Sequence, residues 1–228
     1  MAEVADRMIE EARELVSNRL LWPLVRDFLW DFAPSIHESW IEEKVGSLEG
    51  WKFGSFPSRV KRYILEALNV EPCFHAFPKE DGSRLLLLDG ATLESVVKWL
   101  GALACAAALR RVTNGVTVRE LKATLPGIYP EVFGYTMYFG SLDVQKFEGL
   151  DDGKFGGADV EKVGCELLLQ SLSSLPVPLM HRLKLKLPKR MADMERPNLQ
   201  TSKLPNFQTS IFKLLKLKFP EAYKLCCS

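Results

Sequence analysis

The chain has 228 residues, of which 47% are hydrophobic and 26% are charged, a balance typical of a globular protein rather than a disordered one. Its 30 basic and 29 acidic side chains give a net charge of +1, which predicts no general attraction to nucleic acid or to anionic lipid. Five cysteines, an odd number in a chain of this length, argue against a small disulfide scaffold and favour a reducing compartment.

The charge is divided unevenly along the chain. Residues 179–228 carry 11 basic and 3 acidic side chains, which leaves 19 basic and 26 acidic side chains for residues 1–178. The sequence therefore predicts an acidic body with a basic C-terminal end.

The first predicted helix spans residues 3–30, where apolar side chains recur at helical spacing and Pro23 marks a break or restart. Its start is acidic and amphipathic, which does not fit a secretory signal. The next stretch, residues 31–57, is irregular and rich in aromatic residues, which we expect to pin it to the core. A short helix with Ser58 as its cap should then span residues 58–68.

A small β-hairpin is expected after this helix. Residues 73–77 and 84–88 flank the polar, turn-prone segment 78–83. Two strands alone are only marginally stable, so we expect the hairpin to lean on helices.

The clearest prediction is a central helix. From a cap at Asp89 or Thr92 to Val112 the sequence is apolar on nearly every side, which is typical of a helix at the centre of a fold. Its most apolar stretch, residues 100–109, is well short of the roughly 20 residues that a membrane span requires. We therefore expect a buried core helix.

The elements after Gly115, which should end the central helix, are expected to be short. Thr117 is the expected cap of the next helix, and Pro130 favours the first turn of the one after it. The glycine-rich segment 149–157 predicts a flexible loop. The remaining helices are expected at residues 118–125, 130–139, 159–175, 179–187 and 208–219.

These patterns predict a mainly α protein, a compact helical domain with a small β-hairpin element and a helical C-terminal extension. The expected parts are a helical core with the hairpin (1–148), a flexible loop (149–157), helices packing on the core (158–190), a linker (191–206) and a basic amphipathic tail helix (207–228).

No motif gathers the residues that catalysis would require. A glycine-rich phosphate-binding loop is absent from the sequence, and His37, His75 and His181 are scattered along it. Cys73 and His75 would face the same side of a strand, but packing is their favoured role because no third residue is placed to orient a nucleophile. We expect no enzymatic activity, no cofactor and no metal.

Three segments together resemble one protein family. Residues 32–40 read F-A-P-S-I-H-E-S-W and are similar to the F-x-P-x-x-H-P-S-W signature of the SctK family (YscK and PscK, with OrgA and MxiK more distant). Glu38 stands where that family commonly has proline. The run W-L-G-A-L at residues 99–103, with the L-R-R and V-R-x-L motifs after it, resembles the family's central region. Residues 182–188, R-L-K-L-K-L-P, resemble its C-terminal ending.

The resemblance implies a cytoplasmic helical adaptor of the type III secretion sorting platform. Such a protein would lie at the cytoplasmic face of the bacterial inner membrane. It would bridge the cytoplasmic domain of the ring protein SctD to the pods built from SctQ, with SctL and the ATPase SctN associated indirectly. The resemblance carries no enzymatic activity, and it leaves residues 189–228 without a counterpart.

The candidate partner-binding residues are aromatic or basic, and each also has a structural interpretation. A histidine and a tryptophan three residues apart can pack locally, arginines that end a helix complement its dipole, and alternating basic residues can form a solvated face. The candidates are His37, Trp40, Arg110, Arg111, Arg119, Arg182, Lys184 and Lys186.

An alternative function rests on the basic tail. Residues 211–219 could form a basic amphipathic helix that lies on the membrane or contacts nucleic acid. The lysines at 213, 216 and 218 do not fall on one clean face, because consecutive helical residues are about 100° apart. The adaptor hypothesis is therefore favoured, and no nucleic-acid partner is expected.

Overall fold

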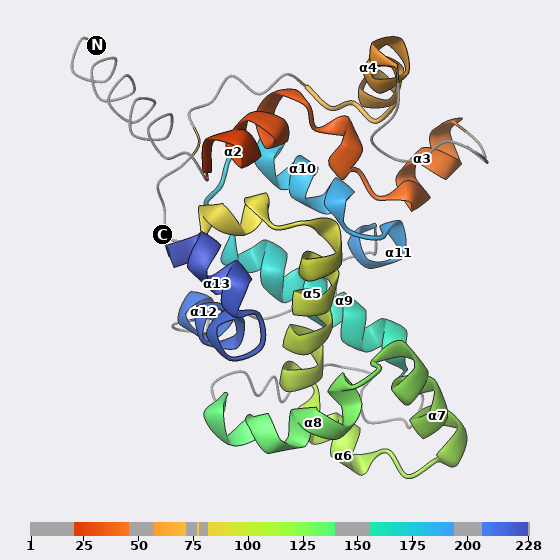
Figure 1. Cartoon of the computed structure of the whole chain (residues 1–228). Coiled ribbons are helices and arrows are strands. Elements are labelled where there is room, and N and C mark those ends of the chain that lie inside the picture. The colour runs from red at the N-terminus through yellow and green to blue at the C-terminus, as the bar shows by residue number, and fades with distance from the viewer. Residues whose placement is uncertain are drawn as a thin grey trace. The chain divides into compact units, whose positions relative to one another are not determined.

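The computed structural model describes residues 21–45, 57–71, 77, 82–139, 156–193 and 207–227. Throughout these ranges the regular structure consists of α-helices and short 3-10 helices, without any strand (Figure 1). The prediction of a mainly α protein is confirmed, and the predicted β-hairpin is not supported.

The chain divides into two compact units. Unit 1 comprises residues 1–90, 174–189 and 225–228, and unit 2 comprises residues 91–173 and 190–224. Each unit therefore combines segments that are far apart in the sequence, and each is described here by itself.

The helices of unit 1 are short, and apolar residues of α2 and α10 lie at its centre. Leu21, Val25, Leu179 and Leu183 are buried there. The ribbon shows α2 and α10 side by side (Figure 1). The elements are α2 (Leu21–Trp30), η1 (Ala33–Ser35), α3 (Glu38–Val45), α4 (Ser58–Ala67), η2 (Ser83–Leu87) and α10 (Val177–Lys186).

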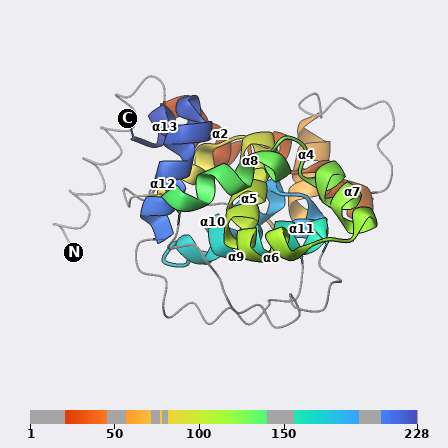
Figure 2. The ribbon, with the colours of Figure 1, turned by 90° about the horizontal axis from the view of Figure 1, so that it is seen from below.

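Unit 2 is organised around the long helices α5 and α9, which lie side by side in both views of the ribbon (Figure 2). The division between the units falls after Gly90, the first residue of α5, and within the short helices α11 and α13. The elements are α5 (Gly90–Ala104), α6 (Ala106–Arg111), α7 (Gly115–Thr124), α8 (Ile128–Tyr135), η3 (Thr136–Tyr138), α9 (Gly157–Ser171), α11 (Lys189–Ala192), α12 (Phe207–Lys218) and α13 (Pro220–Cys227).

Two glycines allow α5 and α9 to cross in backbone contact. A Cβ atom on Gly101 would lie 1.9 Å from the carbonyl oxygen of Val160, and one on Gly164 would lie 1.9 Å from the carbonyl oxygen of Val97. Real Cβ atoms do not approach backbone so closely, so any side chain at either position would force the helices apart. The central position of α5 in its unit, with Val97 and Leu100 fully buried, confirms the expected core helix.

The second arm of the predicted hairpin forms the 3-10 helix η2 instead of a strand. Its leucines, Leu85 to Leu87, are all buried, and the segment therefore lacks the alternation of buried and exposed side chains that a half-buried strand shows. Gly82, with a φ of 100°, adopts the left-handed backbone conformation that leads into this helix. Of the first arm and its turn, residues 72–76 and 78–81 lie outside the described residues.

The predicted helix caps need correction. Pro57 precedes α4, so Ser58 is its first residue and not its cap. Asn114 caps α7 by accepting a hydrogen bond from the backbone N–H of Val116 at 2.9 Å, and Gly115 begins this helix rather than ending the previous one. Asparagine is favoured at this position because its short side chain reaches the free N–H groups of the first turn.

The central helix is interrupted at Cys105, which separates α5 from α6. Backbone hydrogen bonds from Cys105 to Gly101 and from Leu109 to Cys105 nevertheless continue across the interruption. The expected helices at 159–175, 179–187 and 208–219 correspond to α9, α10 and α12. Several predictions concern segments outside the described residues, namely the helix before Leu21, the aromatic residues at 51–56, the loop at 149–155 and the linker at 194–206.

Candidate protein-docking surface

Arg182 lies in the interior of unit 1, with only 3% of its surface exposed. Its Nη1 atom donates hydrogen bonds to the carbonyl oxygens of Phe28 at 2.6 Å and Leu29 at 3.1 Å, and its Nη2 atom donates to that of Glu71 at 2.7 Å. The guanidinium also stacks on the ring of Phe32, 5.1 Å from the ring centroid. Arg182 therefore closes the C-terminal end of α2, where helix carbonyls lack intrahelical partners. It was predicted to be an exposed contact residue, and its burial contradicts that prediction.

Lys186, one turn further along α10, is also buried, with 4% of its surface exposed. Its ammonium donates to the carbonyl oxygen of Leu86 at 2.8 Å and lies 5.5 Å from the centroid of the Phe28 ring. Burial lowers the pKa of this ammonium to about 8, against a smaller opposing effect of Asp89. Lys186 thus joins η2 to α2 inside the unit, and the prediction that it faces a partner is not supported.

His37 and Trp40 form part of a junction between α3 and the end of α10. The backbone N–H of His37 donates to the carbonyl oxygen of Leu185 at 2.8 Å, and the indole N–H of Trp40 donates to that of Leu187 at 2.9 Å. Both side chains are half-buried. Their contacts within unit 1 agree with the structural interpretation given to them in the sequence.

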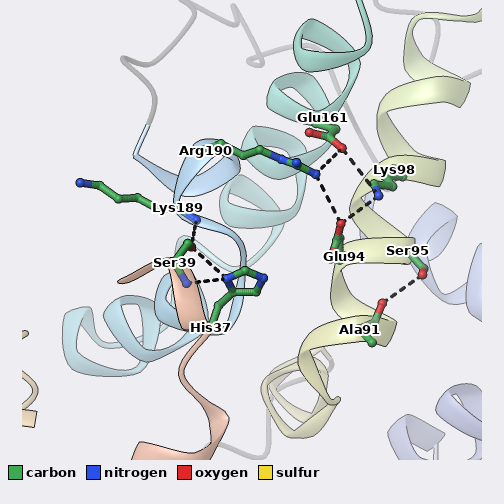
Figure 3. A network of polar contacts seen from close by, with 9 residues as sticks. All are labelled: His37, Ser39, Ala91, Glu94, Ser95, Lys98, Glu161, Lys189 and Arg190. Atoms are coloured by element: carbon green, nitrogen blue, oxygen red, sulfur yellow. Dashed lines mark hydrogen bonds and ion pairs between the residues drawn. The ribbon is translucent and has the colours of Figure 1, made fainter. Parts of the chain in front are cut away.

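A relay of hydrogen bonds completes this junction (Figure 3). The backbone N–H of Lys189 donates to Ser39 Oγ at 2.9 Å, and Ser39 Oγ lies 2.9 Å from His37 Nδ1. His37 Nδ1 also accepts the backbone N–H of Ser39 at 3.2 Å, which places the ring proton on Nε2 in the neutral histidine. The ammonium of Lys189 pairs with Glu43 and lies over the Trp40 ring.

The arginines of α6 and α7 lie in unit 2 and are exposed. Nη2 of Arg110 donates to Thr136 Oγ1 at 2.8 Å and to the carbonyl oxygen of Phe133 at 3.4 Å, which ties α6 to the end of α8. Nε of Arg119 donates to the carbonyl oxygen of Gly115 at 3.2 Å, one turn earlier in its own helix. Arg110, Arg111 and Arg119 are exposed to solvent, which a docking role requires. Lys184, the remaining basic candidate, lies in unit 1 and is half-buried.

Two residues that sequence patterns did not single out are conspicuous on η3. Met137 is 92% exposed and Tyr138 is 60% exposed, and they follow Thr136, whose hydroxyl accepts the hydrogen bond from Arg110. On the other side, Lys213 of α12 donates to the carbonyl oxygen of Tyr138 at 2.7 Å. The helical pattern around Pro130 predicted a helix but not which of its side chains would be exposed. The exposure of Met137 and Tyr138 could therefore not be predicted from the sequence.

Unit 2 contains a cluster of charged side chains that has a structural role. Glu161 on α9 is buried between Arg190 at 3.2 Å and Lys98 at 3.7 Å, and both cations also approach Glu94 (Figure 3). Burial raises the pKa of Glu161, and the two cations oppose that shift. The cluster joins α5, α9 and α11, and each of its carboxylates has a cationic partner.

The tail helix α12 packs its apolar residues against the other helices of unit 2. Ile211, Leu214 and Leu215 are buried, and the ammonium of Lys218 lies 4.2 Å from the centroid of the Tyr135 ring and pairs with Glu131. An amphipathic helix that binds lipid needs its apolar face free. The interior position of this face therefore weighs against the tail as a membrane-binding element.

Metal and thiol chemistry find little support in the described ranges. These residues contain no group of three His, Cys, Asp or Glu side chains placed to hold a metal ion. Burial raises the pKa of the Cys105 thiol above its usual range and that of Cys226 to about 12, which disfavours the thiolate. Cys73 and His75 lie outside the described residues. Among the described helices, none is long and apolar enough to cross a membrane.

The described residues form a mainly helical protein with exposed aromatic, methionine and basic side chains on its surface. Residues 26–127 match the family of the YOP proteins translocation protein K (YscK). The match covers 102 of the 228 residues, and it agrees with the family that the motifs at residues 32–40 and 99–103 resemble. Neither the curated proteins nor the solved structures contain a match to the chain.

Proposed function

We propose that this protein is a cytoplasmic adaptor of the type III secretion sorting platform. It bridges the cytoplasmic domain of the ring protein SctD to pods built from SctQ, at the cytoplasmic face of the inner membrane. SctL and the ATPase SctN are then associated through the pods. The observation that carries this proposal is the YscK family match over residues 26–127.

The two compact units support a bridging role, because each presents aromatic side chains to solvent. In unit 1, Trp30 is 57% exposed and Tyr63 is 55% exposed, and in unit 2, Tyr138 is 60% exposed beside the 92% exposed Met137. Exposed aromatic residues are enriched at the centres of protein interfaces, where they supply much contact area at low entropic cost. An adaptor needs two such surfaces, one for each partner.

A bridging assay tests the proposal directly. The SctD-like cytoplasmic domain is immobilised, and the SctQ-like protein is added with and without this chain. We expect retention of the SctQ-like protein only when the chain is present, because a bridge must hold both partners at once. Binding of each partner alone, without joint retention, would contradict bridging while leaving a simpler binding role.

Binding to lipid or nucleic acid would contradict the adaptor proposal. If the chain retains neither protein but sediments with anionic vesicles or shifts a DNA duplex, the tail-based alternative replaces the adaptor. The buried apolar face of α12 predicts that vesicle sedimentation stays at the level of a protein without a membrane-binding helix.

A further inference from the structure

The short helix η3 presents an almost fully exposed methionine and a largely exposed tyrosine, while Arg110 binds its first residue, Thr136, and Lys213 binds its last, Tyr138. We call Arg110, Met137, Tyr138 and Lys213 the η3 patch. All four residues belong to unit 2. Met137 is 92% exposed, and Tyr138 is 60% exposed although its ring lies 6.3 Å from that of Tyr135. A large apolar side chain left in water forgoes burial that would otherwise favour the protein.

The cations of the η3 patch are held in place, yet they keep donors for a ligand. Nη2 of Arg110 is anchored to Thr136 Oγ1, and its guanidinium lies 5.7 Å from the centroid of the Phe133 ring. Among the described residues, Nε and Nη1 of Arg110 have no hydrogen-bond partner. Fixed guanidinium donors of this kind suit the two oxygens of a carboxylate.

Lys213 has a similar arrangement on the other side. Its ammonium donates to the carbonyl oxygen of Tyr138 and lies 5.5 Å from the centroid of the Phe139 ring. An ammonium has three donors, so two further hydrogen bonds can be offered to a ligand. The tyrosine hydroxyl likewise makes no hydrogen bond to the described residues, and it provides a polar end to an otherwise apolar contact.

The charge around the patch favours an acidic ligand. The nearest carboxylate of α8, Glu131, is paired with Lys218, so it does not neutralise Arg110 or Lys213. Arg110 belongs to the acidic part of the chain, residues 1–178, whereas Lys213 belongs to residues 179–228, which carry 11 basic and 3 acidic side chains. Methionine, tyrosine and arginine are also the residue types enriched at the cores of interfaces.

We propose that the η3 patch is the docking site for an acidic protein segment that carries an apolar anchor residue. The anchor packs on Met137 and Tyr138, and flanking carboxylates accept hydrogen bonds from Arg110 and Lys213. This inference rests on the proposed adaptor function, and it assigns the segment to one of the two proteins that the adaptor joins.

The test compares affinities of the full chain for the recombinant SctD-like domain and the recombinant SctQ-like protein, each measured separately by calorimetry. Tyr138→Ala keeps the backbone carbonyl that binds Lys213, and we expect it to weaken one of the two complexes about 30-fold, as at an interface hot spot. Met137→Ala should weaken the same complex, and Lys213→Glu should weaken it further while reducing its salt dependence.

Matched controls come from α7, where Val116 and Lys122 are exposed in the same unit. Val116→Ala truncates an exposed apolar side chain as Met137→Ala does, Lys122→Glu repeats the charge change of Lys213→Glu, and both controls should leave the two affinities unchanged. Thermal unfolding of Met137→Ala, Tyr138→Ala and both controls should stay close to that of the wild type, because the substituted side chains are exposed. Lys213→Glu also loses the hydrogen bond to the carbonyl oxygen of Tyr138, so a lower unfolding temperature is expected for this variant alone.

Several outcomes would overturn the inference. Unchanged affinities in Tyr138→Ala and Met137→Ala, or an equal loss for both partners, would exclude a dedicated docking site on η3. A wild-type dimer that Tyr138→Ala dissociates, seen by light scattering, would assign the patch to a second copy of the chain. If the wild type binds neither partner, the proposed adaptor function fails, whereas normal wild-type binding with unaffected variants refutes only the η3 patch.

Discussion

The guanidinium of Arg182 donates to three backbone carbonyl oxygens, two of them in the last turn of α2 and the third at Glu71. A neighbouring basic residue of the same helix, Lys186, donates to a fourth carbonyl in η2. The motif at residues 182–188 contains three basic residues. Two of them are therefore buried and donate hydrogen bonds inside unit 1. Their charge is stabilised by peptide dipoles and aromatic rings, and the Asp89 carboxylate also favours the charged form of Lys186.

Replacing Arg182 should destabilise unit 1. In Arg182→Met the carbonyl oxygens of Phe28, Leu29 and Glu71 lose their donor, and we expect the free energy of unfolding to fall by roughly 3 kcal/mol. Urea unfolding followed by circular dichroism measures the change. Lys184→Met, on the same helix but half-buried, should cost less than about 0.5 kcal/mol, and equal effects of the two substitutions would contradict the capping role.

The lowered pKa of Lys186, about 8 against 10.5 for an exposed lysine, predicts a pH dependence of stability. Between these two values the unfolded chain binds more protons at this residue than the folded chain does, so the folded state gains stability as the pH rises. Below pH 8 both states are protonated, and the cost of burying the charge is fully present.

The effect of Lys186 can be isolated by comparison with Lys186→Met, which does not titrate. From pH 8 to pH 10 the free energy of unfolding of the wild type should rise relative to that of the variant, by up to about 1.4 kcal/mol for each pH unit. Urea unfolding at a series of pH values gives the difference. Parallel curves for the two proteins would show that Lys186 keeps an ordinary pKa.

At the scale of elements, the crossing of α5 and α9 depends on the missing side chains of Gly101 and Gly164. The atoms that a Cβ would meet are backbone atoms, 1.9 Å away, and cannot rotate out of the way. The two glycines lie opposite each other, since a Cβ on Gly164 would also come within 2.8 Å of the backbone nitrogen of Gly101. The separation of the helices is thus set by these two positions.

Gly164→Ala should therefore lower the free energy of unfolding by roughly 3 kcal/mol, because a methyl group at this position forces the helices apart. Gly134→Ala is the matched control. It lies in α8 with no atom within 4 Å of its would-be Cβ, and it should be neutral or stabilising by up to about 1 kcal/mol, since alanine has the higher helix propensity. Thermal unfolding of the two variants distinguishes them. An unchanged stability of Gly164→Ala would argue against the close crossing of α5 and α9.

At the scale of the whole molecule, neither compact unit is built from one continuous segment. Unit 1 needs α10, whose Leu179 and Leu183 are fully buried, and unit 2 needs α9, whose Leu167 and Leu168 are fully buried. Both helices follow the segment that matches the YscK family. The matched segment alone therefore lacks part of the core of each unit.

A fragment of residues 21–139 should fail to fold cooperatively. Without α9 and α10 it loses apolar burial worth about 1.5–3 kcal/mol for each large side chain removed, which exceeds the usual margin of stability. We expect a broad urea transition and rapid proteolysis, compared with a sharp transition for the full chain. A sharp transition in the fragment would show that the matched segment is an independent domain.

Helix positions could be predicted from the sequence because an apolar stripe at a period near 3.6 residues depends only on local order. The elements α9, α10 and α12 lie close to their expected bounds, and the motifs at residues 32–40 and 99–103 were sufficient to indicate the YscK family. The error at η2 arose because a short apolar run fits a buried strand as well as a buried helical turn.

The roles of charged and exposed residues were decided by the tertiary structure. Nothing near Arg182 in sequence reveals that the end of α2, about 150 residues earlier, will offer it carbonyl oxygens. In the same way, the exposure of Met137 and Tyr138 depends on how α6 and α12 approach η3. Periodicity identifies which face of a helix is apolar, but the atoms that meet a polar side chain come from distant segments, and only the folded chain brings them together.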